Sequence, residues 1–159
     1  MPNSRSFSPA TIFATWFGAG FLPAPGTAGS AGAILAGVAL HCWLGAGPLT
    51  FAVLAAAFLL PGVWASTQVA RERNLKDPQI VVIDEVLGQW VVLAGAASLG
   101  NPWTWLMAFG LFRLFDIWKP FPIRRLEKLP EGWGVVMDDI LAGVYGAVLL
   151  RLLGWWNLV

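Results

Sequence analysis

The sequence predicts an all-α fold, a polytopic membrane helical bundle with about five transmembrane helices and short interfacial helices. Two observations support this fold class. First, hydrophobic residues make up 57% of the 159 residues and charged residues only 12%, with a mean hydropathy of +0.67. A soluble domain of this size could not bury so much apolar surface. Second, the apolar residues form long runs separated by short turns, and a helix needs about 20 such residues to cross a bilayer.

The first two predicted spans follow each other directly. Residues 27–47 contain no charged side chain, and a helix of that length rises about 31 Å, enough to cross the hydrocarbon core. After a short turn rich in glycine, a second uncharged run covers residues 49–70. Pro61 and Gly62 interrupt it, and a neighbouring helix can accommodate them as a kink. We expect these two spans to form a helical hairpin.

Three further spans complete the predicted bundle. The apolar stretch 86–99 reaches an ordinary spanning length only if its helix begins near Ile80. Residues 103–118 then return through the membrane, and the last span runs over 139–155. Between these two spans, residues 120–129 alternate apolar with charged side chains, which predicts a short interfacial helix.

The distribution of basic residues predicts the orientation. Seven of them occupy two connections between spans: Arg71, Arg73, Lys76, Lys119, Arg124, Arg125 and Lys128. By the positive-inside rule these connections face the cytoplasm, with the N-terminus inside and the C-terminus outside. Residues 1–9 carry only Arg5 as a basic residue and continue into the apolar residues 10–17 without a clear small-residue cleavage site, so we expect no signal peptide. The net charge of +1 argues against a general nucleic-acid binder, so the expected partners are the membrane and a lipid.

Five carboxylates gather at the predicted cytoplasmic ends of the last three spans. They are Asp84, Glu85, Asp116, Asp138 and Asp139. An ionised carboxylate costs about 2.5–3.5 kcal/mol at the centre of a membrane helix, so this group needs compensation. Mg²⁺ takes oxygen ligands and is often held by a few carboxylates together with substrate phosphate. The alternative is a set of interfacial salt bridges to Arg113, Lys119 and Arg124.

The start of the first span, PGTAGS, supports phosphate binding. Its glycines allow close approach of the backbone, and the N–H groups of a helix N-terminus attract anions. Thr27 and Ser30 add hydroxyl groups, although they could equally cap or pack the helix. Arg113 and Lys119 lie three residues before and after Asp116, so we expect them on the same helical face, where they can bind phosphate.

Four blocks in this order resemble the phosphatidylglycerophosphatase A family over nearly the whole chain. The blocks are PGTAGS from Pro25, IDEVLG from Ile83, FRLFDIWKPFPI from Phe112 and VMDDILAG from Val136. The resemblance implies one membrane-embedded domain over residues 1–159 in the bacterial inner membrane. It also implies a Mg²⁺-dependent enzyme that dephosphorylates phosphatidylglycerophosphate to phosphatidylglycerol, with its active site facing the cytoplasm.

Carried onto this chain, the family motifs select the same residues as candidates. Thr27, Ser30 and Lys119 would bind the substrate, and the helical spacing described above adds Arg113 to this set. The five carboxylates would be the catalytic and metal-binding groups. They would position one or two Mg²⁺ ions and activate water for in-line attack, although a carboxylate nucleophile stays open. His41 lies at the predicted opposite face, and Cys42 has Pro48 rather than an arginine six residues later. The sequence therefore lacks the residues that a phosphohistidine or a cysteinyl-phosphate mechanism requires.

Two other functions are compatible with acidic residues in a membrane protein. An ion-coupled transporter would use intramembrane carboxylates, but it would hold them near the bilayer midplane rather than at one face. A non-catalytic membrane assembly subunit would explain the helices rich in small residues. It would leave the clustered acids without a role.

Overall fold

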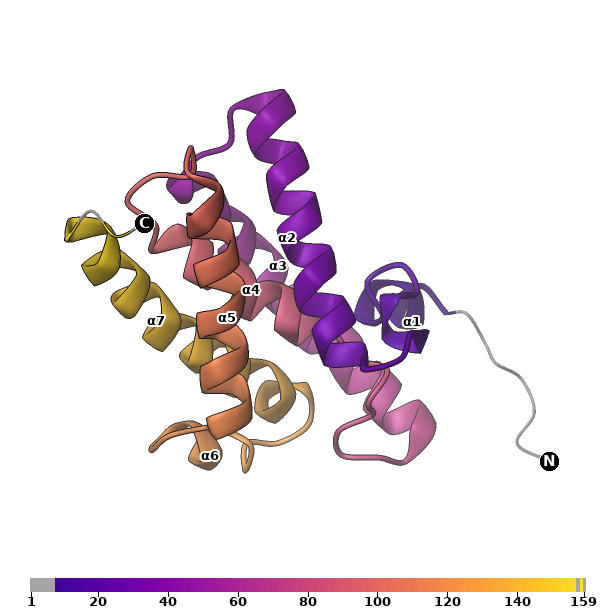
Figure 1. Cartoon of the computed structure of the whole chain (residues 1–159). Helices are drawn as coiled ribbons and strands as arrows, with labels where there is room; N and C mark the ends of the chain where they lie inside the picture. Colours follow the sequence, from indigo (N-terminus) through magenta and orange to yellow (C-terminus); the bar gives the residue numbers. More distant parts are fainter. Residues whose placement is uncertain (1–7, 157, 159) are drawn as a thin grey trace.

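The computed structural model describes residues 8–156 and residue 158. The expectation that no signal peptide is present concerns residues 1–9, most of which lie outside this range. Within it the regular structure is helical and contains no strand (Figure 1), so the all-α prediction is confirmed. The elements are α1 (Pro9–Ala14), η1 (Ala19–Phe21), α2 (Pro25–Leu44), α3 (Pro48–Arg73), α4 (Ile83–Ala94), α5 (Pro102–Trp118), α6 (Ile123–Leu126) and α7 (Gly132–Trp155).

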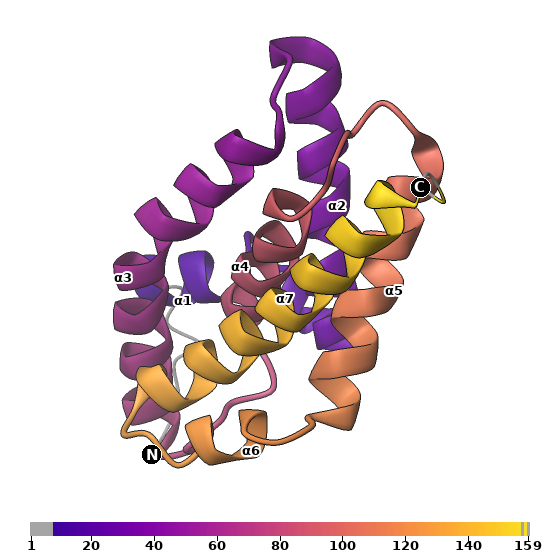
Figure 2. The same ribbon diagram turned by 90° about the vertical axis from the view of Figure 1, so that its left-hand side faces the viewer.

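Helix α4 lies at the centre of the bundle, and α2, α3, α5 and α7 all pack against it (Figures 1 and 2). Nine of its 12 residues are buried. A helix of this length rises only about 18 Å, which is less than a bilayer core. The helix begins at Ile83 and ends at Ala94, so the start predicted near Ile80 is wrong, and α4 without its flanking segments is shorter than an ordinary span.

Helices α2 and α3 are long and apolar enough to cross a membrane by length and composition. Gly45 ends α2 with a φ of 66°, a left-handed conformation that glycine adopts at helix ends without steric cost. Helix α3 continues through Pro61 over its 26 residues. Beyond their turn the two helices diverge, and α4 lies between them (Figure 2). The two predicted helices are thus consecutive and joined by a short turn, but both pack on α4.

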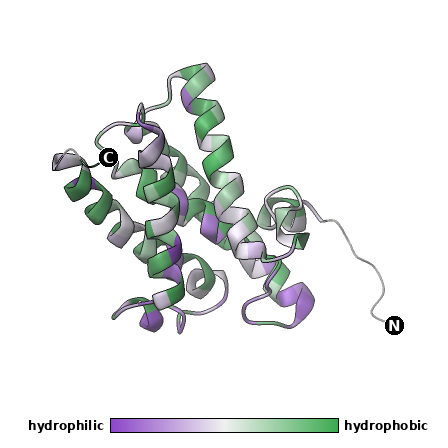
Figure 3. Cartoon of the chain, viewed as in Figure 1, coloured by the Kyte–Doolittle hydropathy of each residue, from purple (hydrophilic) through white to green (hydrophobic). Residues whose placement is uncertain are grey.

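In the described part of the chain, the other helices do not combine the length and the apolar composition of a membrane span. Helix α5 has 17 residues, and α7 has 24 but contains Asp138, Asp139 and Arg151. Hydrophilic residues gather mainly in the lower half of the bundle (Figure 3), where the basic connections lie. Many apolar side chains on the outer surface are exposed, such as Leu35 at 70% and Leu49 at 78%.

Helix α7 begins seven residues before the predicted position. Asp138 and Asp139 therefore lie in its second turn and do not open it, contrary to the prediction. Contacts with α3 fix the early start: the N–H of Gly132 donates to Thr67 Oγ1 at 3.0 Å. A Cβ atom on Gly132 would lie 2.3 Å from the carbonyl oxygen of Val63, so the two backbones touch here.

The short elements differ from the sequence expectations. The interfacial helix expected over 120–129 is reduced to the single turn α6, and its Ile123 is fully buried against α7. Helices α1 and η1 were not expected as separate elements. Helix α1 supports the segment that precedes α4, since the N–H of Val82 donates to the carbonyl of Ala14 at 2.8 Å, and η1 approaches the same segment where Gly20 lies against the Ile80 carbonyl.

Candidate metal and phosphate site

The predicted site residues converge on one pocket of about 350 Å³, which we call the acidic pocket. The start of α2, the segment before α4, the start of α4, the end of α5 and the second turn of α7 form its walls. Eight of the nine predicted residues line it: Thr27, Asp84, Glu85, Arg113, Asp116, Lys119, Asp138 and Asp139. Side chains up to 112 residues apart in the sequence therefore share one pocket.

Close packing of α4 on α7 brings the acids together. A Cβ atom on Gly143 would lie 2.5 Å from the carbonyl oxygen of Gly88. One on Gly88 would lie 2.7 Å from the carbonyl oxygen of Asp139. Only residues without a side chain allow the two backbones to approach so closely. As a result, Asp139 of α7 faces the first turn of α4.

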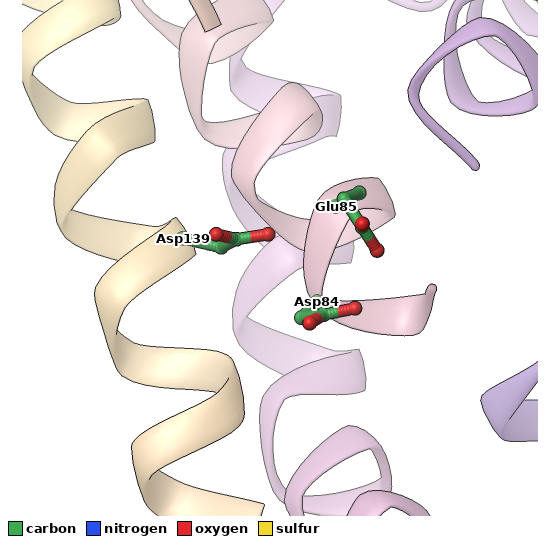
Figure 4. Close-up of side chains that lie close together, drawn as sticks. All are labelled: Asp84, Glu85 and Asp139. Atoms are coloured by element: carbon green, nitrogen blue, oxygen red, sulfur yellow. The ribbon is translucent and has the colours of Figure 1, made fainter. Parts of the chain in front are cut away.

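Asp84, Glu85 and Asp139 form a buried cluster, the acidic triad. One carboxylate oxygen from each lies within 4.8 Å of the others, and Figure 4 shows Asp139 extending from α7 toward the two α4 side chains. Asp84 and Asp139 are only 8% and 4% exposed. In the described part of the chain, Asp84 Oδ1 and Glu85 Oε2 are buried without a hydrogen-bond partner.

These close and largely buried carboxylates repel one another and have lost water, and a bound cation would offset both effects. Their ligand atoms are all oxygen, which suits a hard divalent ion such as Mg²⁺ better than zinc. The acidic triad could therefore hold a metal ion.

The other two predicted acids are already paired with cations. Arg113 Nη1 lies 2.5 Å from Asp116 Oδ2 on the last turns of α5. Lys119 Nζ lies 2.6 Å from Asp138 Oδ2 and 2.8 Å from Glu127 Oε1. The salt-bridge alternative thus holds for Asp116 and Asp138, and it does not hold for the triad.

Lys119 occupies a constrained position at the end of α5. Its φ of 47° is left-handed, which is uncommon for a residue other than glycine and is often tolerated at functional sites. Burial lowers the pKa of Lys119, but the hydrogen bonds to Asp138 and Glu127 outweigh this effect and raise the pKa above its ordinary value. The ammonium group is therefore charged at the pocket wall.

The start of α2 contributes backbone donors. No side chain caps this helix at Ala24, so its first N–H groups are available to an anion in the pocket. A Cβ atom on Gly26 would lie 2.5 Å from Glu85 Oε1 and 3.1 Å from Arg113 Nη1. Glycine at this position allows the helix start to lie directly against the acids and the cation.

Ser30 is the one predicted site residue that the structure does not bring into the pocket. Its side chain is fully buried, and its hydroxyl donates to the carbonyl oxygen of Gly26 at 2.9 Å. A serine inside a helix often satisfies its hydroxyl in this way. The substrate-binding role predicted for Ser30 therefore has no geometric basis, whereas Thr27 is exposed to the pocket.

Two polar residues of the pocket were missed from the sequence. Asp77 and Gln79 line it from the segment between α3 and α4. In the sequence this segment is conspicuous only for its basic residues, which predict the orientation. The signal for Asp77 was present, because it is an acid in the same predicted cytoplasmic connection.

The fold and the pocket define a class: an α-helical protein in which buried carboxylates suited to a metal ion adjoin cations and helix N–H groups suited to a phosphate. A sequence model of phosphatidylglycerophosphatase A matches residues 12–154. The chain belongs to the phosphatidylglycerophosphatase A family and is a phosphatase. The family resemblance of the four sequence blocks is therefore confirmed. Family membership favours an enzyme over the transporter and the assembly subunit.

Curated relatives match nearly end to end. A Bacteroides thetaiotaomicron protein provisionally named phosphatidylinositol-3-phosphatase is 41% identical, over 94% of this chain and 96% of the relative. Proteins named phosphatidylglycerophosphatase A from Haemophilus influenzae and Escherichia coli are 38% and 34% identical. They cover 95% and 92% of this chain, and 92% and 84% of their own lengths. No solved structure matches.

Proposed function

We propose that this protein is a Mg²⁺-dependent lipid phosphatase that converts phosphatidylglycerophosphate to phosphatidylglycerol and inorganic phosphate at the cytoplasmic face of the bacterial inner membrane. One observation carries the proposal: the acidic triad shares a pocket with Arg113, Lys119 and the open N-terminus of α2. A metal-ligating group and a phosphate-binding group are thus adjacent. The names of two relatives supply the substrate.

The pocket residues divide into two sets under this proposal. Asp84, Glu85 and Asp139 hold the ion, which when bound would offset the charge of the phosphate and lower the pKa of a water molecule. Arg113 and Lys119 bind phosphate oxygens by charge-assisted hydrogen bonds. The N–H groups at the start of α2 and the hydroxyl of Thr27 add neutral donors.

Asp116 and Asp138, which the sequence predicts as further metal ligands, position the two cations in this arrangement. Asp116 holds Arg113 and Asp138 holds Lys119 through the ion pairs already described. Because each carboxylate is neutralised by its partner, each is a poorer metal ligand than the triad. They act on the substrate through the cations.

Hydrolysis breaks the bond between phosphorus and the terminal glycerol oxygen. A water oxygen forms the new bond to phosphorus, a pocket carboxylate takes one proton from that water, and the same proton is returned to the leaving glycerol oxygen. Attack by a pocket carboxylate is the alternative, and acid-quenched protein analysed by mass spectrometry would reveal its phosphorylated intermediate.

The membrane arrangement is part of the proposal. The chain forms one membrane-embedded domain over residues 1–159 and passes the bilayer five times, through α2, α3, the short α4 with its flanking segments, α5 and α7. The N-terminus lies inside and the C-terminus outside. The lengths of α2 and α3 and the basic connections at one end of the bundle support this topology.

The decisive experiment measures phosphate release from phosphatidylglycerophosphate by purified protein in neutral detergent, with Mg²⁺ or with a chelator. Wild type should act only with the metal ion. Asp84→Asn and Asp139→Asn should each lose at least about 100-fold in kcat/KM, as expected for groups that stabilise charge during the reaction. Glu72→Gln, an exposed acid on α3 outside the pocket, is the matched control. Metal-independent activity, or full activity of both triad variants, would refute the proposal.

Phosphatidylinositol 3-phosphate is a second candidate substrate, favoured by the name of the 41% identical relative. It is also a phospholipid with a phosphomonoester on its headgroup, so the same pocket chemistry applies. Side-by-side kcat/KM values for the two lipids decide which one the protein prefers.

A further inference from the structure

A second pocket adjoins the acidic pocket at Lys119. It has a volume of about 450 Å³ and is lined by residues 118–122 together with Arg124 and Arg125. We call it the arginine pocket. Lys119 lines both pockets, so a ligand that extends from one to the other passes its ammonium group.

Both arginines are held over this pocket by contacts with its wall. The guanidinium carbon of Arg125 lies 4.5 Å from the centroid of the Phe121 ring, a cation–π contact. Arg124 Nη2 donates to the carbonyl oxygen of Trp118 at 3.4 Å. Such contacts leave most of the donors of each guanidinium group available.

Neither arginine is neutralised by an acid. The ion pairs of the described chain involve Arg71, Arg113 and Lys119, and none involves Arg124 or Arg125. Two guanidinium groups without an acidic partner at one pocket favour a phosphate group, whose oxygens match their planar donor geometry.

The rim of the arginine pocket is apolar and exposed. Ile117, Trp118 and Phe121 are 72%, 61% and 70% exposed. Aromatic side chains of this kind sit at the membrane–water interface, at the level of lipid headgroups. This exposed apolar rim favours a phosphate that belongs to a phospholipid headgroup over a free ion in solution.

We propose that the arginine pocket binds the phosphodiester of the lipid substrate while its terminal phosphomonoester occupies the acidic pocket. This inference rests on the proposed function. Phosphatidylglycerophosphate and phosphatidylinositol 3-phosphate both carry a phosphodiester and a separate phosphomonoester, whereas phosphatidic acid carries the phosphomonoester alone. The arginine pocket thus selects lipids whose headgroup has both groups.

The kinetic test compares phosphatidylglycerophosphate with phosphatidic acid in neutral detergent. The double variant Arg124→Ala with Arg125→Ala should raise KM for phosphatidylglycerophosphate about tenfold or more. It should leave kcat for that lipid and all activity on phosphatidic acid unchanged. Lys128→Ala removes an exposed cation nearby that does not line the pocket and should have no effect. Equal loss on both lipids, or no loss on either, overturns the proposal.

A second arm separates the substrate phosphodiester from bulk anionic lipid. Titrating phosphatidylserine into the detergent should leave the KM difference between wild type and the double variant in place. If the anionic lipid instead stimulates hydrolysis of both substrates, and the double variant loses this stimulation, the pocket binds bulk lipid and the substrate assignment is overturned.

A binding measurement tests the role of the arginine pocket without requiring the protein to hydrolyse a substrate. Short-chain phosphatidylglycerol carries the phosphodiester without the phosphomonoester, and calorimetry should show its Kd rising about tenfold in the double variant and unchanged in Lys128→Ala. An unchanged Kd in the double variant overturns the inference. Absence of hydrolysis by wild type would refute the proposed function alone, because this binding arm would still decide the role of the pocket.

Discussion

Lys119 and Asp138 form an ion pair that connects the end of α5 to the second turn of α7, with Nζ and Oδ2 2.6 Å apart. The aspartate side chain is only 6% exposed, against 25% for the lysine. Asp138 is therefore a nearly buried charge that depends on this lysine. Lys119 lines both pockets. A change in this ion pair should therefore alter both the folding stability and the proposed binding of phosphate.

Replacement of Lys119 should affect activity and stability together. Lys119→Met should lower kcat/KM about 10- to 100-fold, because a charge-assisted contact to phosphate is lost, and should lower the free energy of unfolding by about 1–3 kcal/mol, because Asp138 is left unpaired. Lys119→Arg should retain most of the stability. Steady-state kinetics and chemical denaturation in detergent measure both effects. Lys128→Met should change neither, and wild-type kinetics in Lys119→Met would contradict the assigned role.

The acidic triad predicts opposite effects of one substitution with and without metal. In chelator, Asp139→Asn should raise the Tm, because it removes one of three mutually repelling carboxylates. With Mg²⁺ the wild type should gain Tm, because an ion that binds only the folded state stabilises it, and the variant should gain little. Mn²⁺ binding followed by electron paramagnetic resonance provides a readout that does not depend on activity. Glu72→Gln should behave as wild type, and a full Mg²⁺ response in Asp139→Asn would exclude the triad as the metal site.

The close approach of α4 to α7 can be tested with two glycines. Gly88→Ala places a Cβ atom 2.3 Å from Phe112 Cε2 and 2.7 Å from the Asp139 carbonyl. We expect it to lower the free energy of unfolding by about 1–3 kcal/mol and to reduce activity by moving Asp139 away from Asp84. Gly110→Ala is the control, since nothing lies within 4 Å of its Cβ position, and it should be neutral or slightly stabilising. Thermal unfolding compares the two, and equal behaviour would contradict the packing described here.

The two hydroxyls at the start of α2 should differ. Thr27→Ala should raise KM about two- to tenfold, the value of one ordinary hydrogen bond to substrate. Ser30→Ala should leave KM unchanged, because its hydroxyl is buried and bonded to Gly26. Kinetics with the lipid substrate test this difference directly, and a KM effect confined to Ser30 would reverse the assignment.

The proposed topology predicts which loops a membrane-impermeant thiol reagent can reach. On a Cys42→Ser background, Ser98→Cys lies in the exposed connection between α4 and α5 and should be labelled in intact spheroplasts. Lys128→Cys, beside α6, should be labelled only after the membrane is opened. The reverse pattern would invert the orientation, and labelling of both sites in intact spheroplasts would remove the crossing by α5.

By itself, the sequence determined the all-α class, the family and eight of the nine candidate residues that line the pocket. These features depend on short stretches of sequence. Hydropathy and turn residues indicate the helices, and the four motif blocks contain the site residues, without any need to know the distances between them. The tertiary structure alone decided that α4 is a short core helix, that α7 starts at Gly132, and that Ser30 is turned away from the pocket.

Only the tertiary structure also divided the five acids into a triad of Asp84, Glu85 and Asp139 and two ion-paired carboxylates. The reason is that burial and charge pairing depend on distances between side chains. The spacing of residues along a chain does not determine whether Lys119 reaches Asp138 or another acid. The distances within the triad are set when α7 packs onto α4 through Gly88 and Gly143, and the distance from Lys119 to Asp138 is set when α5 packs onto α7.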